Sequence, residues 1–181
     1  MRIITENKKL SRKKKRIYVL IGSGIYVMII LPIIGILVSM ALNNLLNLPK
    51  IIPTPYNFVV AAIILIVGFF WAIWSNIEIY KRGNGSPVPF KDTHTLNIVT
   101  SGPYKYTRNP MIFGYILIWI GLGILINSFF LTVGFSLIIL ILLVLVVKLW
   151  EEKNLEKRFG NQYLEYKEKV SFIIPFLKKA K

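Results

Sequence analysis

The residues best suited to chemistry lie in two polar stretches that flank one apolar segment. The first, Thr93–Tyr115, carries Arg108 among Gly-Pro and Asn-Pro pairs, which are typical of an ordered turn. The second begins with Glu151 and Glu152, just after the apolar segment ends at Lys148. If that segment folds as a helical hairpin, its two ends meet and bring the arginine and the acids together. Such a group suits a ligand with both charges and hydroxyl groups, because carboxylates accept hydrogen bonds and a guanidinium binds a carboxylate or phosphate.

Both groups of acids also have a structural interpretation. Glu151 and Glu152 alone would suit a solvated first turn of a helix, where the dipole favours negative charge. Glu78 lies in the last turn of an apolar run, where an ionisable group is a candidate functional residue. It is equally compatible with pairing to Lys81 or Arg82 at the membrane surface. The sequence leaves these interpretations open.

Composition narrows the function classes. The chain has 181 residues, 55% of them hydrophobic, and a formal net charge of +15. It has no cysteine and one histidine, so disulfides and thiolate nucleophiles are excluded and no metal site is predicted. The basic residues cluster at the ends of apolar runs, which favours attraction to a membrane surface over nucleic-acid binding.

The apolar runs predict an all-α integral membrane protein with about four transmembrane helices. Each crossing needs roughly 20 apolar residues. The first run, 17–42, contains Pro32, which should kink it, and the second spans 58–79. The third, 111–147, is long enough for two short crossings with a tight turn at Asn127 and Ser128.

These runs divide the chain into parts. A basic tail precedes two transmembrane helices, and a core follows that consists of a polar loop, the hairpin and a C-terminal amphipathic segment. In that last segment Gly160 is expected to stop one helix and Asn161 to cap the next, with the apolar face against the membrane or the loop. The predicted bounds are 1–16, 17–80, and 81–181, the last divided into 81–110, 111–148 and 149–181.

The distribution of basic residues predicts the orientation. Lysine and arginine are concentrated in the N-terminal tail, the 81–110 loop and the C-terminal tail, and the other two connections are poor in them. Four crossings place these three segments on one side. We therefore expect a multi-pass protein whose termini and loop are cytoplasmic.

Three segments in order resemble one group of membrane enzymes. RGNGSPVPF (82–90), LNIVTSGPYKYTRNPM (96–111) and EEKNLEKRFGNQYLEY (151–166), followed by a Val170 to Pro175 ending, are similar to the isoprenylcysteine carboxyl methyltransferases. They are similar also to the related phospholipid (phosphatidylethanolamine) methyltransferases. The resemblance implies an integral-membrane methyltransferase that uses S-adenosyl-L-methionine and acts on the polar head of a lipidic substrate.

The resemblance also assigns residues. Arg108 matches the arginine of an Arg-His-Pro motif, and Asn109 stands where the prenylcysteine enzymes have histidine, a departure that leaves the substrate open. Arg108, Asn109 and Glu152 are the implied catalytic residues. The implied cofactor-binding residues are His94, Leu96, Gly102, Pro103, Tyr104, Arg108, Pro110, Met111, Glu151 and Glu152.

The sequence is also compatible with two other classes of protein. An NADPH-dependent membrane reductase of the sterol-reductase type resembles the same C-terminal region, and a non-enzymatic membrane protein would need no cofactor. The methyl acceptor is also open. A carboxylate needs only orientation, for which Arg108 is suited, whereas an amine must lose a proton to a base such as His94, Glu78 or one of the paired acids.

Overall fold

The structure is a computed structural model that describes residues 18, 21–22, 25–84 and 95–176. Within these residues every regular element is helical, and the β contacts amount to one isolated bridge between Thr107 and Ser171. With α for an α-helix and η for a short π- or 3-10 turn, the elements in chain order are η1 (Tyr26–Ile30), α2 (Leu31–Leu45), α3 (Tyr56–Glu78), η2 (Ile79–Gly83), η3 (Gly102–Lys105), α4 (Pro110–Leu125), η4 (Phe130–Phe135), α5 (Ser136–Val146), η5 (Val147–Glu151), α6 (Glu152–Phe159) and α7 (Asn161–Lys169). The predicted all-α class is confirmed for the described residues.

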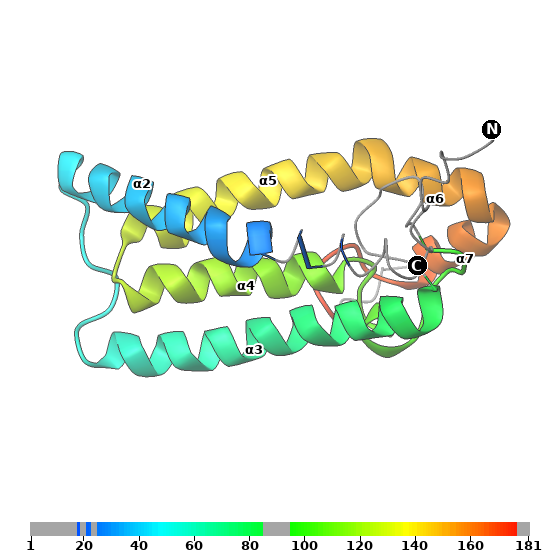
Figure 1. Cartoon of the computed structure of the whole chain (residues 1–181), viewed down its shortest axis with the longest axis horizontal. Helices are drawn as coiled ribbons and strands as arrows, with labels where there is room; N and C mark the ends of the chain where they lie inside the picture. The colour runs from blue at the N-terminus through cyan, green and yellow to red at the C-terminus, as the bar shows by residue number, and fades with distance from the viewer. Residues whose placement is uncertain (1–17, 19–20, 23–24, 85–94, 177–181) are drawn as a thin grey trace, which may run out of the picture.

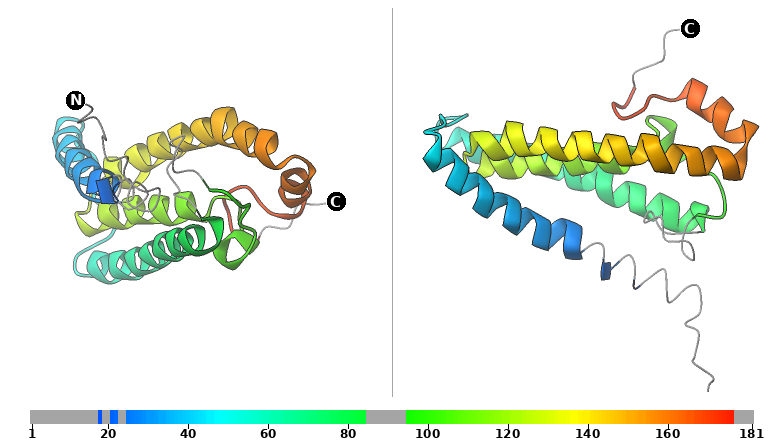
Figure 2. Two further views of the ribbon diagram at one scale, coloured as in Figure 1. Left: turned by 45° about the vertical axis from the view of Figure 1, so that its right-hand side comes forward. Right: turned by 90° about the horizontal axis from the view of Figure 1, so that it is seen from above.

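The long helices run along one axis, and α6 and α7 gather at one end of it (Figure 1). Two continuous helical stretches, Tyr56–Gly83 and Phe130–Phe159, are long and apolar enough to cross a membrane. The helices Leu31–Leu45 and Pro110–Leu125 are apolar but shorter. Seen from above, α2 diverges from the other three helices toward its N-terminal end (Figure 2).

The first helix changes its winding next to Pro32, and the kink expected there stays a prediction. The π-helical turn η1 ends at Ile30, and the α-helix proper begins at Leu31 with Pro32 in its first turn. Proline has no N–H, and its ring collides with the carbonyl four residues earlier, so the preceding turn widens.

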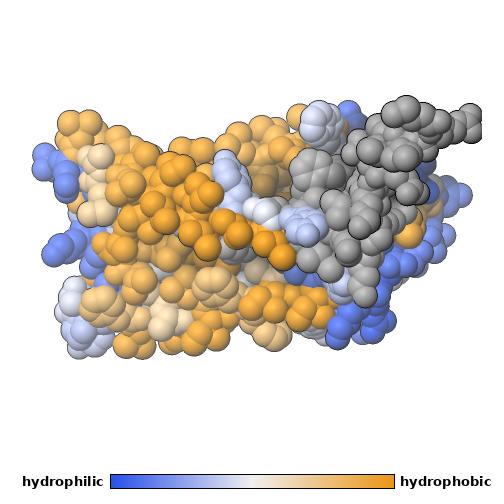
Figure 3. All heavy atoms as spheres, in the orientation of Figure 1, coloured by the Kyte–Doolittle hydropathy of each residue, from blue (hydrophilic) through white to orange (hydrophobic). Residues whose placement is uncertain are grey.

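Large apolar side chains point outward along most of the bundle length. Leu37, Ile66, Phe70 and Leu142 are all more than half exposed. The space-filling view shows a broad hydrophobic band along the bundle, with hydrophilic residues at its two ends (Figure 3). A soluble monomer rarely exposes so large an apolar area, whereas lipid tails would cover it.

Glycines allow the helices inside this band to approach closely. A Cβ on Gly114 of α4 would lie 2.7 Å from the Gly68 carbonyl oxygen and 2.7 Å from the Ala72 nitrogen of α3. Nearby, Trp119 is fully buried, and its ring packs against Phe135 with centroids 4.7 Å apart. Small residues at such crossings are typical of membrane helix packing.

The helices end in two different polar regions. We call residues 43–57 with 124–130 the amide end, and residues 78–84, 95–109 and 148–176 the charged end. At the amide end α4 stops at Leu125 and Asn127 takes a left-handed conformation, φ 57°, which confirms the predicted turn. At the charged end Gly160, φ 55°, separates α6 from α7 as predicted. The predicted Asn161 cap is wrong: Gly160 occupies the capping position, and no side chain caps α7.

Candidate active site

The charged end is built around an ion pair between Arg108 and Glu152. Arg108 Nη1 lies 2.5 Å from Glu152 Oε1, and the two side chains are 6% and 10% exposed. Arg108 stands just before α4, and Glu152 is the first residue of α6. The predicted meeting of the hairpin's two flanks is therefore confirmed by the structure.

A buried pair is stable only when its remaining hydrogen-bonding atoms also find partners. The second oxygen of Glu152, Oε2, lies 3.2 Å from Lys167 Nζ of α7. The hydroxyl of Tyr163 donates to Oε1 over 3.4 Å. Lys167 also binds Glu156 at 2.7 Å, and this bond, more than the contact with Glu152, raises the pKa of Lys167. Lysine 167 had no role in the sequence-based site, because nothing in its spacing distinguishes it from the other lysines of the tail.

Arg108 is held by more than its ion pair. Its backbone N–H donates to the Ser171 carbonyl over 2.9 Å, and its guanidinium lies 5.3 Å from the centre of the Phe172 ring. The Nε atom is buried and has no hydrogen-bond partner among the described residues. A buried donor without an acceptor is costly, so an acceptor supplied by a ligand would satisfy it.

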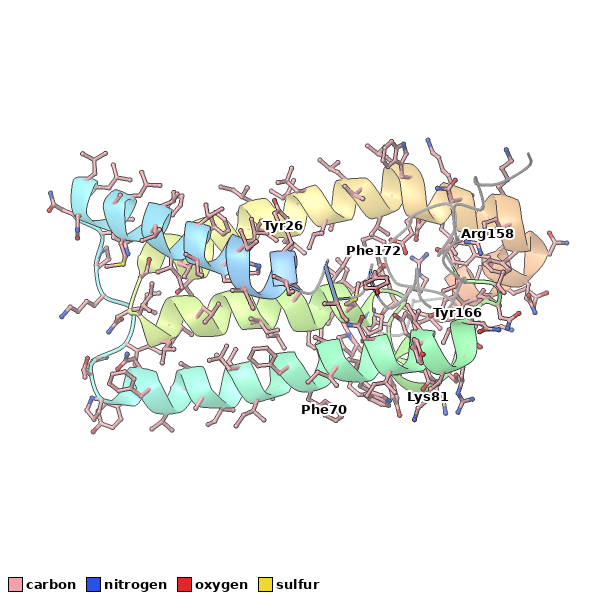
Figure 4. All side chains as sticks on the ribbon, in the orientation of Figure 1. Tyr26, Phe70, Lys81, Arg158, Tyr166 and Phe172 are labelled. Atoms are coloured by element: carbon pink, nitrogen blue, oxygen red, sulfur yellow. The ribbon has the colours of Figure 1, made fainter. Side chains whose placement is uncertain are left out.

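The residues Ser171–Phe176, which we call the clasp, lie along the loop that leads into α4. The Phe172 carbonyl accepts hydrogen bonds from Thr107 Oγ1 at 3.2 Å and from Asn109 Nδ2 at 2.8 Å. The Phe176 N–H donates to the Tyr106 carbonyl over 3.3 Å. Figure 4 shows Phe172 and Tyr166 at the end of the bundle that also holds Lys81 and Arg158. The clasp thus holds the backbone on both sides of Arg108.

Asn109 has a structural partner in this arrangement. Its side-chain amide donates to the clasp, as described, and its backbone N–H donates to Thr107 Oγ1 over 3.3 Å. The amide that stands in the place of a histidine therefore ties the loop to the C-terminal segment. A catalytic role for Asn109 stays a prediction.

Three buried tyrosines line the same region. Burial, reinforced by nearby Glu152, raises the pKa of Tyr163, and burial with the charge of Glu151 raises that of Tyr104. Tyr166 donates its hydroxyl to the Tyr104 carbonyl over 2.6 Å, and burial raises its pKa too. All three phenols stay protonated at neutral pH, and those of Tyr163 and Tyr166 donate hydrogen bonds. The amphipathic tail thus turns Tyr163 and Tyr166 toward the loop.

The two adjacent acids have different surroundings. The charge of Glu152 is neutralised by ion pairs with Arg108 and Lys167. Among the described residues, Glu151 forms no ion pair with either cation. Glu151 is only partly exposed and lies close enough to Tyr104 and Tyr163 to act on both electrostatically. A hydroxyl or ammonium group of a ligand would be a suitable partner for Glu151.

The other predicted cofactor-binding residues are only partly gathered here. Pro103 and Tyr104 are buried in η3, and Pro110 is buried at the start of α4. Met111 turns to α3, where its sulfur accepts from Asn76 Nδ2 at 3.4 Å. Leu96 is 47% exposed and belongs to a separate contact in which its N–H binds the Gly83 carbonyl. His94 lies outside the described residues.

Comparison with known proteins shows which family the chain belongs to. A family model described as phospholipid methyltransferase matches residues 56–162, which is more than half of the chain. The chain therefore belongs to the phospholipid methyltransferase family. It is also 38% identical over 99 residues to the protein-S-isoprenylcysteine O-methyltransferase of Xenopus laevis. The matched stretch covers 50% of this chain and 30% of the frog protein. The resemblance inferred from the three motifs is confirmed.

Proposed function

We propose that the protein is an integral-membrane methyltransferase that uses S-adenosyl-L-methionine to methylate the polar head of a lipidic substrate. Family membership supports the reaction class, and the broad apolar surface supports a substrate held in the bilayer. The observation that carries the proposal is the buried Arg108–Glu152 pair with an unpartnered Arg108 Nε beside it.

The residues at the charged end fit this cofactor. Arg108 Nε is an available donor for its carboxylate, while Glu151 and Glu152 would accept hydrogen bonds from its ribose hydroxyls or ammonium group. The η3 turn, with Gly102, Pro103 and Tyr104, would form the wall of the pocket. When bound, the cofactor supplies an electrophilic methyl group on a sulfonium. The chain's own residues position the acceptor and exclude water, because in-line displacement depends mainly on alignment.

The acceptor is proposed to be a lipid-borne carboxylate or amine. A carboxylate is already ionised, so Arg108 would only have to orient it. An amine must be deprotonated first, and Glu151, which lacks the compensating cations of Glu152, is the better placed of the two acids to take the proton. The lipid tail would enter between the helices from the bilayer.

The proposed topology has four crossings, with the termini and the loop 81–110 on the cytoplasmic side. Two helices are long and apolar enough to cross, two more are apolar but shorter, and the break at Asn127 separates the two arms of the hairpin. The charged end would lie at the cytoplasmic membrane surface, where basic residues are favoured. The bilayer itself is then the principal partner, and no nucleic acid is required.

The test is methyl transfer from a labelled methyl donor to a native lipid extract, catalysed by the purified protein in lipid nanodiscs. One lipid class should gain label, and its headgroup identifies the acceptor. Arg108→Lys and Glu152→Gln should each lose more than about tenfold in turnover, because lysine lacks the planar fork and glutamine lacks the charge. Glu165→Gln, at a glutamate that is 71% exposed, is the matched control and should keep full activity. Binding of NADPH with no binding of S-adenosylhomocysteine would contradict the proposal and support a reductase.

A further inference from the structure

Glu78, the last residue of α3, is buried at the charged end although it belongs to an apolar helix. It is 8% exposed. Its Oε1 lies 2.8 Å from Arg82 Nε, one helical turn further on, and accepts a hydrogen bond from Ser101 Oγ over 2.7 Å. The pairing with Arg82 agrees with one of the two interpretations left open by the sequence. The contact with Ser101 was not predicted, because the two residues lie 23 positions apart and no pattern in the sequence pairs them.

The two partners contribute unequally. The Arg82 side chain is 65% exposed, and such surface pairs contribute little to stability. The bond from Ser101 is partly buried and charge-assisted, which makes it the stronger of the two. Glu78 therefore acts mainly on the loop and only secondarily on its own helix.

The carboxyl group also packs directly against the next residue of the loop. Gly102 has φ 58°, and a Cβ built on it would lie 2.8 Å from the Glu78 carboxyl carbon and 3.1 Å from Oε1. The left-handed backbone and the missing side chain together let the loop close over the carboxylate. A loop that fits a buried charge this closely has its position set by that charge.

The same loop carries the proposed cofactor site. Gly102 opens η3, whose Tyr104 carbonyl receives the hydroxyl of Tyr166. Arg108 follows six positions after Gly102, and its backbone is held by the clasp. A shift of the loop at Ser101 would therefore move the wall of the pocket and the arginine together.

We propose that Glu78 is a positioning residue that anchors the Ser101–Gly102 turn to α3 and thereby sets the geometry of the cofactor-binding loop. The identity of the ligand in this inference rests on the proposed function, whereas the anchoring of the loop by Glu78 does not. It differs from the role of a general base, in which Glu78 would take a proton from the acceptor. Here the membrane helix and the loop are locked together through one carboxylate.

Two measurements test the anchor, and the first needs no cofactor. Amide hydrogen exchange over residues 99–108 is measured in the unliganded protein in nanodiscs. Glu78→Ala should speed exchange in this segment about tenfold or more, and Ser101→Ala should do so to a smaller extent, because local opening is easier once the anchor is lost. Ser75→Ala is the matched control, since its hydroxyl is buried on the same helix and, among the described residues, bonds only to the Trp71 carbonyl of that helix. It should leave exchange over 99–108 unchanged.

The second measurement is calorimetric titration with S-adenosylhomocysteine, combined with turnover. Glu78→Ala should weaken binding about tenfold, the scale of one lost hydrogen bond to a charged group. Ser101→Ala should add nothing to that loss in the double variant, because the same contact is already gone. Glu78→Gln keeps an oxygen that accepts from Ser101, so its dissociation constant should stay within about threefold of the wild type, with kcat retained.

Each result decides between anchor and base. Loss of turnover in Glu78→Gln with unchanged ligand affinity would overturn the proposal in favour of a general base. Unchanged exchange and affinity in Glu78→Ala would remove any role for the contact. If the wild-type protein fails to bind S-adenosylhomocysteine, the proposed function is wrong, while the exchange experiment still tests the anchor.

Discussion

The two ends of the helical bundle hold their loops to the helices with different chemical groups. At the amide end, three asparagines join the loops. Asn127 Oδ1 accepts from the N–H groups of Ile51 and Ile52, and its Nδ2 donates to the Ile52 carbonyl. Asn43 receives the N–H of Phe130, and Asn57 donates to the last carbonyls of α4. Each amide satisfies backbone groups that the helix ends leave without partners.

The charged end adds ionised side chains to the neutral hydrogen bonds of the clasp. Glu152 draws in Arg108 and Lys167, and Glu78 draws in Ser101 and Arg82. Ions cost more to bury than amides, and removing one partner exposes that cost at once. Charged groups at a helix end are thus a poor means of stabilising a loop but a good means of binding a charged ligand. The contrast indicates that the amide end serves mainly stability and the charged end mainly function.

The largest expected effect is at the charged end. Glu152→Ala leaves Arg108 buried without its counter-ion and should lower the free energy of unfolding by about 3–5 kcal/mol, with loss of cofactor binding. Arg108→Ala should behave alike, and the double variant should be less unstable than the sum of the two. Urea unfolding in detergent micelles measures the cycle. If the two single losses of stability simply add in the double variant, the two charges do not stabilise each other, and the contrast between the charged end and the amide end is wrong.

The next effect is expected in the middle of the bundle, where both ends depend on one helix crossing. Gly114→Ala places a methyl group 2.7 Å from backbone atoms of α3. Backbone atoms cannot move away by a change of rotamer, as a side chain could. The expected cost is about 3 kcal/mol, the upper part of the range for overpacking. Cofactor affinity should fall as well, because Arg108 lies just before the first residue of α4. Gly22→Ala is the control, since a Cβ there meets nothing within 4 Å. A neutral Gly114→Ala, by thermal unfolding, would mean that the crossing adjusts freely.

A smaller loss is expected at the amide end. Asn127→Ala removes three hydrogen bonds to the neighbouring loop and puts alanine in a left-handed conformation, for a cost of about 2 kcal/mol. Affinity for S-adenosylhomocysteine should not change. Asn127→Gly separates the two contributions, because glycine accepts the backbone conformation but makes none of the bonds. A loss of affinity in either variant, measured by calorimetry, would contradict the division of labour between the ends.

Much of this arrangement could be predicted from local signals. Asn127 and Gly160 break helices because few residues adopt a left-handed backbone easily, so the breaks are visible in the residue types themselves. The meeting of Arg108 with Glu152 follows from their positions on either side of one hairpin. These predictions need only the positions of the apolar runs and the short connection between two helices.

The contacts that the sequence did not reveal are long-range and come from irregular segments. Phe172 lies more than 60 positions after Arg108 and Asn109, yet its ring contacts Arg108 and its carbonyl accepts from Asn109. The sequence around Phe172 shows no periodic pattern that would predict these contacts. The Ser101 bond to Glu78 is of the same kind. Asn161 resembled a cap by residue type, yet the left-handed Gly160 before it already redirects the chain and takes the capping position. Residue type alone does not specify which backbone group a loop side chain will meet.

The smallest expected effect concerns the second cation on Glu152. Lys167 is 33% exposed and shares its charge between Glu152 and Glu156. Lys167→Met should cost only about 0.5 kcal/mol of unfolding free energy, the usual size for a partly solvated pair. Affinity for S-adenosylhomocysteine should change by a few-fold at most, and Lys167→Arg should restore it. The sharper test compares the two cations that contact Glu152. Removing Lys167 should lower the free energy of unfolding far less than removing Arg108, because the arginine is buried and the lysine has water as an alternative partner. Equal losses, measured by urea unfolding and titration on the same preparations, would show that Glu152 needs both cations and that the buried Arg108 is no more important to the charged end than the partly exposed Lys167.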